Sequence, residues 1–232
     1  MDQIITNKIF IAQNIQLLSR EKNSVLIGIK GLYPGYGVTV GNALRRILLS
    51  SIPGAAITTV KIENVLHEFS TLPGVLEDVL EITLNLKQVR IEMLTSEPQE
   101  IYLEAKGEVE VKAGDITVPS NCRIVNPELH IATLTDKKAS LKMRMKVEKG
   151  IGFVSAEEIR KNSPETDAIF LDAIFSPVRK VNFEVENMRI GERTDYNFLK
   201  IYIETDGTID PIEAYNQAID ILVHQFNLIK IS

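Results

Sequence analysis

A strict alternation of apolar and polar residues between Ala139 and Glu148 constrains the fold of this chain most. Apolar side chains occupy every second position from Ala139 to Val147, and Ser140 and charged residues fill the positions between them. Successive side chains of a β-strand point to opposite faces, so the pattern predicts an antiparallel strand with one buried face and one wet face. Similar alternation recurs at residues 25–29, 55–62, 181–185 and 199–205. The chain is therefore expected to contain mainly antiparallel sheet.

The last helix of the chain has the clearest start signal. Asp210 is expected to cap it, Pro211 suits its first position, and Glu213 completes a capping-box pattern. Apolar residues then follow at spacings of three and four, as in a heptad seam, and a second apolar row runs beside them. One sheet cannot cover both rows, so we favour a contact with a second subunit over a deeply buried helix of a monomer. The seam consists of Ile212, Tyr215, Ile219, Leu222, Phe226 and Ile229, and the second row of Ala214, Ala218, Ile221 and Leu228.

The segment from Gly35 to Gly54 predicts another amphipathic helix. Leu49 is expected to point away from its core-facing stripe, between Arg45 and Arg46. Apolar anchors with arginine at their edge are typical of protein interfaces, although single exposed leucines are also common. We therefore expect Leu49 to contact a partner. The core-facing stripe is expected to contain Val40, Ala43, Leu44, Ile47 and Leu48.

Two polar segments are assigned from weaker signals. An acidic helix is expected from Val75 to about Leu86, with Glu77 and Asp78 on a solvated face. The stretch from Ser155 to Asp167 is polar and is expected to be a mobile loop.

Composition narrows the class of protein. The 232 residues include only one cysteine, Cys122, and three histidines, so no disulfide or cysteine-based zinc site is expected. The N-terminus lacks a basic stretch followed by an apolar one, which predicts a cytoplasmic protein without a membrane span. A net charge of −5 argues against a free-standing DNA-binding protein.

Signals for catalysis are weak. Gly35, Gly37 and Gly41 suggest a phosphate-binding loop, but their spacing does not fit the dinucleotide-binding pattern and Pro34 precedes them. A dinucleotide-binding enzyme using this turn is kept as an unlikely alternative. No catalytic residue and no metal ligand is predicted.

Four segments together resemble a known family: the N-terminal domain of the bacterial-type RNA polymerase alpha subunit. The resemblance covers essentially the whole chain and implies an α+β fold in two subdomains. A discontinuous dimerisation subdomain, residues 1–53 and 178–232, would hold an antiparallel sheet and two helices. An inserted, mainly β subdomain, residues 54–177, would contact the large subunits. The four segments are Gly35–Gly54, Val65–Lys87, Leu171–Val178 and Glu192–Ala218.

The resemblance also implies a function. The chain would be a non-catalytic, homodimeric scaffold for the two large subunits, of beta and beta-prime type, of a DNA-directed RNA polymerase in the bacterial cytoplasm or a plastid. Nucleotidyl transfer and its Mg²⁺ would belong to another subunit, so no cofactor is expected here. The family's C-terminal DNA-binding domain has no counterpart in the sequence, and direct DNA contact is not expected. An unrelated homodimeric binding module would explain the last helix but not the four ordered segments. The residues expected to contact large subunits are Arg45, Arg46, Leu49, Lys87, Leu171 and Asp172.

Overall fold

The described residues form two compact units. The computed structural model describes residues 14–65, 67–165 and 167–231. Unit 1 comprises the described residues up to Ile52 together with those from Pro177 onward, and unit 2 spans Pro53–Ser176. The expected subdomain limits lie one residue from these bounds.

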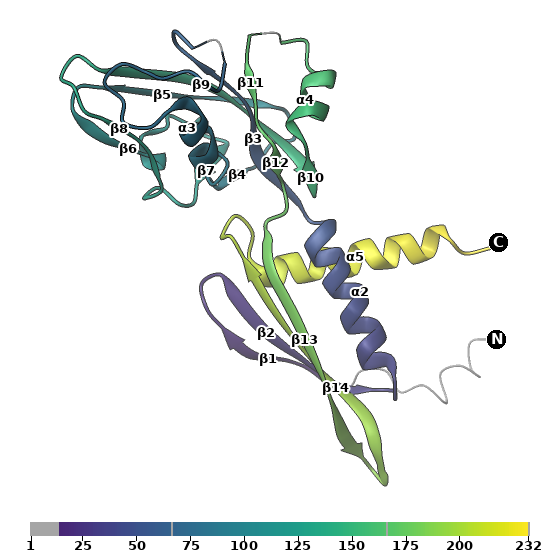
Figure 1. The fold of residues 1–232 in the computed structure, drawn as a ribbon. Helices are drawn as coiled ribbons and strands as arrows, with labels where there is room; N and C mark the ends of the chain where they lie inside the picture. The colour runs from purple at the N-terminus through teal and green to yellow at the C-terminus, as the bar shows by residue number, and fades with distance from the viewer. Residues whose placement is uncertain (1–13, 66, 166, 232) are drawn as a thin grey trace. The chain divides into compact units, whose positions relative to one another are not determined.

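Unit 1 is a four-stranded antiparallel sheet with two helices on one face (Figure 1). Its strand order is β1-β2-β14-β13, so strands from the two ends of the chain pair at its centre. This arrangement makes unit 1 discontinuous in sequence. The strands are β1 (Asn14–Arg20), β2 (Ser24–Leu32), β13 (Val178–Ile190) and β14 (Arg193–Thr205), and the helices are α2 (Tyr36–Ser50) and α5 (Pro211–Leu228).

The helix-covered face of this sheet is apolar because its strands alternate. Val25, Ile27 and Ile29 in β2 are buried, and the odd-numbered residues of β14 from Leu199 to Ile203 join them in one core. Both helices contribute to that core, through Leu44 and Leu48 in α2 and through Ala214, Tyr215 and Ala218 in α5. The alternation expected at residues 25–29 and 199–205 is thereby confirmed.

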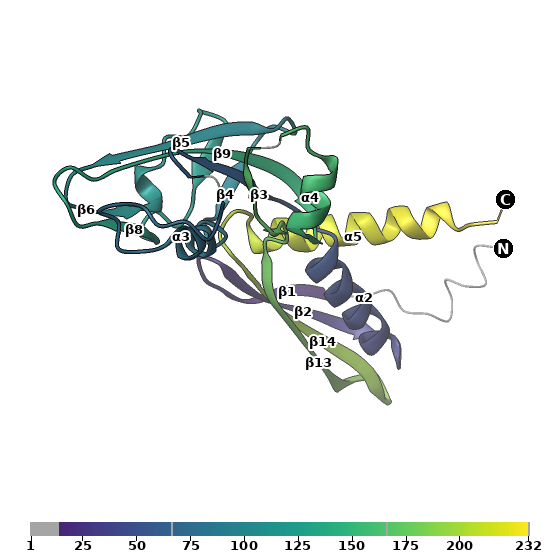
Figure 2. The ribbon, with the colours of Figure 1, turned by 45° about the horizontal axis from the view of Figure 1, so that its top comes forward.

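Unit 2 is mainly β. Its largest sheet has the order β11-β3-β9-β5 and is antiparallel throughout; β10 pairs with β12, β4 with β7, and β6 with β8. Helix α3 packs beside β8 (Figure 2), and α4 contacts β11. The strands are β3 (Pro53–Ile62), β4 (Ile91–Met93), β5 (Gln99–Lys106), β6 (Val109–Lys112), β7 (Cys122–Ile124), β8 (His130–Leu134), β9 (Ser140–Ile151), β10 (Phe153–Val154), β11 (Ile169–Phe170) and β12 (Ala173–Ile174); the helices are α3 (Val79–Leu86), the 3-10 helix η1 (Ala113–Asp115) and α4 (Ala156–Asn162).

The alternation in β9 is confirmed. Leu141, Met143, Met145 and Val147 are buried in the core of unit 2, and the side chains between them lie toward solvent. Together with the strands of unit 1, this strand establishes the expected α+β class. No helix among the described residues is long and apolar enough to cross a membrane.

Helix α3 begins later than predicted. It starts at Val79 rather than Val75, because the Asp78 carboxylate accepts a hydrogen bond from the Glu81 N–H (2.7 Å) and caps the helix. The preceding residues are not helical: Val75 forms a bridge with Leu134, and the Leu76 N–H donates to the Thr133 carbonyl (2.9 Å). The prediction of a helix from Val75 is therefore wrong over its first turn.

The expected loop from Ser155 to Asp167 contains a helix instead. The Ser155 hydroxyl accepts from the Glu158 N–H (3.3 Å) and caps α4. Glu157 and Glu158 in the first turn also favour helix formation, since acidic side chains stabilise helix N-termini. The helix buries none of its residues fully, which explains why the segment shows no apolar periodicity.

Candidate assembly interfaces

Helix α2 lies unusually close to the sheet of unit 1. Gly35 adopts a left-handed conformation (φ 87°) just before the helix, as glycine readily does. Gly37 and Gly41 face the sheet: a Cβ on Gly37 would lie 2.7 Å from Val185 Cγ1, and one on Gly41 would lie 2.6 Å from Phe183 Cδ2. The close contact therefore requires glycine at both positions.

This contact turns the helix relative to the predicted orientation. The buried residues of α2 are Gly37, Gly41, Leu44 and Leu48, whereas three members of the expected stripe are only half-buried. An apolar pattern does not count glycine as a contact residue. The predicted buried face therefore omits Gly37 and Gly41 and is centred on the side of Val40, Ala43 and Ile47. The half-buried members of the expected stripe are Val40, Ala43 and Ile47.

Because of this rotation, Leu49 is less exposed than predicted. Leu49 is half-buried and packs against the core of unit 1, so the prediction that it points directly away from the core is wrong. Arg45 is exposed, but its Nε donates to the Val181 carbonyl (3.3 Å). Arg46 is exposed. Of the three expected contact residues on α2, Arg45 and Arg46 are thus exposed, and Arg45 is also bonded to β13.

Helix α5 is buried at its start and exposed at its end. Asp210 caps it, accepting from the Ile212 N–H (2.9 Å) and the Glu213 N–H (3.4 Å). The predicted cap is confirmed, but Glu213 accepts from Gln217 Nε2 (3.2 Å). The reciprocal contact of a capping box is not among the contacts described for this helix.

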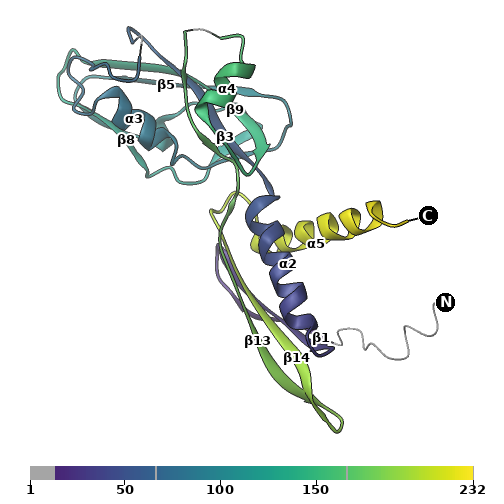
Figure 3. The same ribbon diagram turned by 45° about the vertical axis from the view of Figure 1, so that its right-hand side comes forward.

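The residues of the predicted seam of α5 differ in exposure, and the last of them are the most exposed. Tyr215 is buried, Ile212, Ile219 and Leu222 are half-buried, and Phe226 is 60% exposed. Beyond them Ile229, which ends the helix, is 72% exposed. Val223 and Leu228 are exposed on the same stretch, which extends past α2 and away from the sheet (Figure 3). Unit 1 therefore presents a projecting helix end rich in apolar side chains.

The edge strand β1 adds apolar surface to unit 1. Ile15 and Leu17 are exposed and pair with Ile29 and Ile27 of β2. Directly opposed residues of an antiparallel pair share a face, so Ile15 and Leu17 lie on the helix-bearing side of the sheet. Exposed apolar groups that gather on one side of a protein mark an interaction site.

In unit 2, Lys87 and Asp172 form an ion pair. Lys87 Nζ lies 2.9 Å from Asp172 Oδ2, and the other carboxylate oxygen accepts from the Ala156 N–H (2.9 Å) at the start of α4. The Ala156 N–H, followed by Lys87, holds the pKa of Asp172 below its usual range. Leu171 is only 2% exposed and belongs to the core of unit 2. The contact expected at the Leu171–Asp172 pair therefore depends on Asp172.

Two leucines that the sequence reasoning did not select lie beside Lys87. Leu80 and Leu84 are exposed, and helical spacings of three and four place them on the same face of α3 as Lys87. The sequence could have indicated this surface: once Val79, Ile82 and Leu86 are assigned to the core, Leu80 and Leu84 remain as apolar residues on the outer face of the helix.

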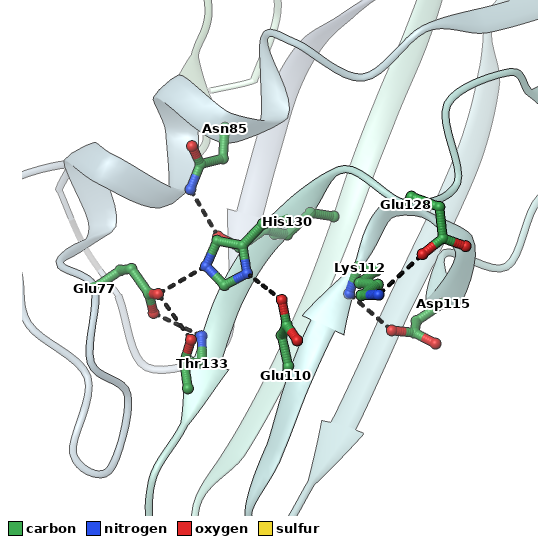
Figure 4. A network of polar contacts seen from close by, with 9 residues as sticks. Glu77, Asn85, Glu110, Lys112, Asp115, Glu128, His130 and Thr133 are labelled. Carbon is green, nitrogen blue, oxygen red and sulfur yellow. Dashed lines mark hydrogen bonds and ion pairs between the residues drawn. The ribbon is translucent and has the colours of Figure 1, made fainter.

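Glu77 belongs to a buried polar network in unit 2 (Figure 4). It is 7% exposed, and its carboxylate accepts from the Thr133 N–H (2.6 Å) and hydroxyl (3.0 Å) and contacts His130 Nε2 (2.8 Å). Burial raises the pKa of Glu77, but the hydrogen bonds from Thr133 and His130 outweigh it, so the net shift is downward. The prediction of a solvated Glu77 is wrong, because Glu77 lies before the start of α3, in a bend where its side chain reaches Thr133 of β8.

Comparison with known proteins decides the family. Residues 60–176 match the family described as RNA polymerase Rpb3/RpoA insert domain. Proteins named DNA-directed RNA polymerase subunit alpha are similar over most of the chain: 50% identical over 200 residues in Symbiobacterium thermophilum and 51% over 201 residues in Thermus aquaticus. This chain belongs to the RNA polymerase alpha-subunit family. Each alignment covers 86% of this chain and 63% of the relative, so the chain spans less than two thirds of the alpha subunits it matches.

The dinucleotide-binding alternative does not fit an alpha-family chain with this geometry. Dinucleotide-binding loops follow a strand of a parallel sheet, whereas the strand pairs that the structure describes in unit 1 are all antiparallel. The N–H groups of Gly35 and Gly37 also donate to the side chain of Asn197, at 2.9 and 3.1 Å. A phosphate would have to displace that side chain.

Proposed function

We propose that this chain is the dimeric scaffold of a DNA-directed RNA polymerase, on which the two large subunits assemble. The observation that carries the proposal is the exposed apolar end of α5 in a chain of the alpha-subunit family. Nucleotidyl transfer and its Mg²⁺ belong to a large subunit in this proposal, and the assembled enzyme works in the cytoplasm. No cluster of three or more potential metal-ligating side chains occurs among the described residues, and the proposal needs none.

The dimer contact proposed for unit 1 uses the end of α5. Leu222, Phe226 and Ile229, spaced by four and three residues on one face of the helix, would pack against the same helix of a second copy about a two-fold axis, which lets one surface serve both subunits. Ile15 and Leu17 on β1 would extend this contact.

The contact proposed with the second-largest subunit uses α2. Arg46 supplies an exposed guanidinium, and half-buried Leu49 and hydrogen-bonded Arg45 border it. Arginine beside a partly buried apolar side chain is a frequent centre of binding energy. In unit 2, Lys87, Asp172, Leu80 and Leu84 would form a separate large-subunit contact, in which the ion pair holds α4 in place.

Capture of the cognate second-largest subunit tests the proposal. The tagged full-length chain should bind it, and Arg46→Ala should weaken binding by roughly 2 kcal/mol, as at a central anchor. Arg179→Ala is the matched control, since Arg179 is also an exposed arginine of unit 1 but lies on β13. Failure of the parent chain to capture the subunit would overturn the scaffold function. Equal binding by Arg46→Ala would overturn the assignment of α2.

A further inference from the structure

Asn197 of β14 contacts the start of α2 across a long separation in sequence. Its side-chain oxygen accepts hydrogen bonds from the N–H groups of Gly35 (2.9 Å) and Gly37 (3.1 Å). Asn197 is only 6% exposed, so neither the side chain nor the Gly37 N–H can exchange these bonds for water without opening the site.

Helix α2 has no cap from its own sequence. The first N–H groups of a helix lack partners within the helix, and a Ser, Thr, Asp or Asn side chain at the N-cap usually accepts from one of them. Gly35 stands at that position in α2 and has no side chain to offer. The Tyr36 N–H donates to the Tyr33 carbonyl (3.0 Å), and Asn197 receives the N–H groups on either side of it.

The sheet holds Asn197 in place for this contact. Leu199, Ile201 and Ile203 alternate along β14 toward the helices, and Asn197 is the next residue of that row. The pairing between β14 and β2 shifts register between Asn197 and Phe198, where such irregularities commonly redirect a side chain. A Cβ on Gly37 would lie 3.0 Å from Asn197 Cβ, so the two backbones approach closely.

We propose that Asn197 is a positioning residue for the partner-binding face of α2. The asparagine fixes the first turn of the helix, and the contact of Gly41 with Phe183 fixes its second turn. Two fixed points determine the rotation of the helix about its axis, and that rotation sets the direction of Arg46 and Leu49. The inference rests on the proposed function, because it assigns Asn197 a role in binding the second-largest subunit.

The test compares Asn197→Ala with Asn197→Asp in the full chain. Alanine removes the acceptor, whereas aspartate keeps an acceptor oxygen in place of Asn197 Oδ1 and adds a negative charge that a helix N-terminus favours. In Asn197→Ala, the Gly35 and Gly37 amide protons should exchange roughly tenfold faster, and capture of the cognate second-largest subunit should fall by about tenfold or more. Asn197→Asp should restore both. If the alanine variant does not fold, Asn197→Leu fills the space without an acceptor.

Each outcome bears on a different statement. Unchanged amide exchange in the variant without an acceptor would show that Asn197 does not cap α2. Faster exchange with unchanged capture, or a loss of capture that aspartate does not restore, would overturn the positioning role. Failure of the parent chain itself to capture the subunit would instead overturn the proposed function, and the role of Asn197 with it.

Discussion

Gly41 in α2 lies against the ring of Phe183 in β13, with no room between them for a methyl group. A Cβ on Gly41 would lie 2.6 Å from Phe183 Cδ2, and 3.0 Å from Leu199 Cδ1. Side chains from two strands thus meet one residue of the helix. The contact sets how near α2 can approach the sheet.

Substitution of Gly41 tests this packing. Gly41→Ala should lower the free energy of unfolding by roughly 1–3 kcal/mol, because the overpacking cost exceeds the helix propensity that alanine gains. Urea unfolding of the full chain measures the effect. Asn42→Ala, at an exposed neighbouring position, should stay within about 0.5 kcal/mol of the parent. A Gly41→Ala protein as stable as the parent would show that α2 can shift away from the sheet without loss of stability.

A charge at Phe226 should separate dimerisation from folding. Phe226 is largely exposed in one copy, so Phe226→Glu should leave the protomer folded and yield monomers at micromolar concentration, because an unpaired buried charge opposes the contact. Sedimentation velocity and circular dichroism measure the two properties. Ala218→Glu should instead unfold unit 1, since Ala218 is fully buried, and Gln225→Glu should change neither. A dimeric Phe226→Glu protein would contradict the proposed interface.

Stability should distinguish the residues of α2 by their burial. Leu48→Ala should cost about 2–5 kcal/mol because Leu48 has no exposed surface, and Leu49→Ala about 1–2 kcal/mol because that side chain is half-buried. Arg46→Ala should remain within about 0.5 kcal/mol of the parent. Thermal or urea unfolding gives the order. A Leu49→Ala protein with parental stability would restore the view of Leu49 as a purely external anchor.

Glu77 should make the stability of unit 2 depend on acid pH. Its folded-state pKa is lowered, so its contribution is present above the ordinary glutamate pKa and is lost as the pH falls through the folded value. Glu77→Gln should therefore cost about 1–3 kcal/mol at neutral pH, and the difference from the parent should shrink in acid. Urea titrations across this range measure it. Glu97→Gln is the control, since Glu97 is exposed and lies outside the helices and strands of unit 2, and a difference that grows in acid would contradict the assignment.

Features that depend on residues close together in the sequence could be predicted, and polar contacts between residues far apart in the sequence could not. The alternation of β9 and the cap at Asp210 are local patterns, so the sequence shows them directly. Asn197 breaks the apolar row of Leu199, Ile201 and Ile203, but only the folded chain shows that Gly35 lies beside it. Local sequence patterns thus indicate the helices and strands, whereas contacts between distant residues appear only in the folded structure.

The same distinction explains the two errors of greatest consequence. Glycine adds nothing to an apolar pattern, so the pattern misses Gly37 and Gly41 on the buried face of α2 and predicts Leu49 on the opposite face. Glu77 is expected on the solvated face of a helix that begins at Val75, but its partners Thr133 and His130 lie far along the chain and bury it.

Because unit 1 is built from both ends of the chain, the ribosome synthesises its first strands before unit 2 and its last strands after it. Strand β2 pairs with β14, so the apolar side chains of Val25, Ile27 and Ile29 emerge long before the strand that pairs beside them. All of unit 2 is synthesised in between. The inserted unit can then fold while the first strands still await their neighbours, since domains generally fold as units during synthesis. The sheet of unit 1 can therefore close only after unit 2 has been synthesised.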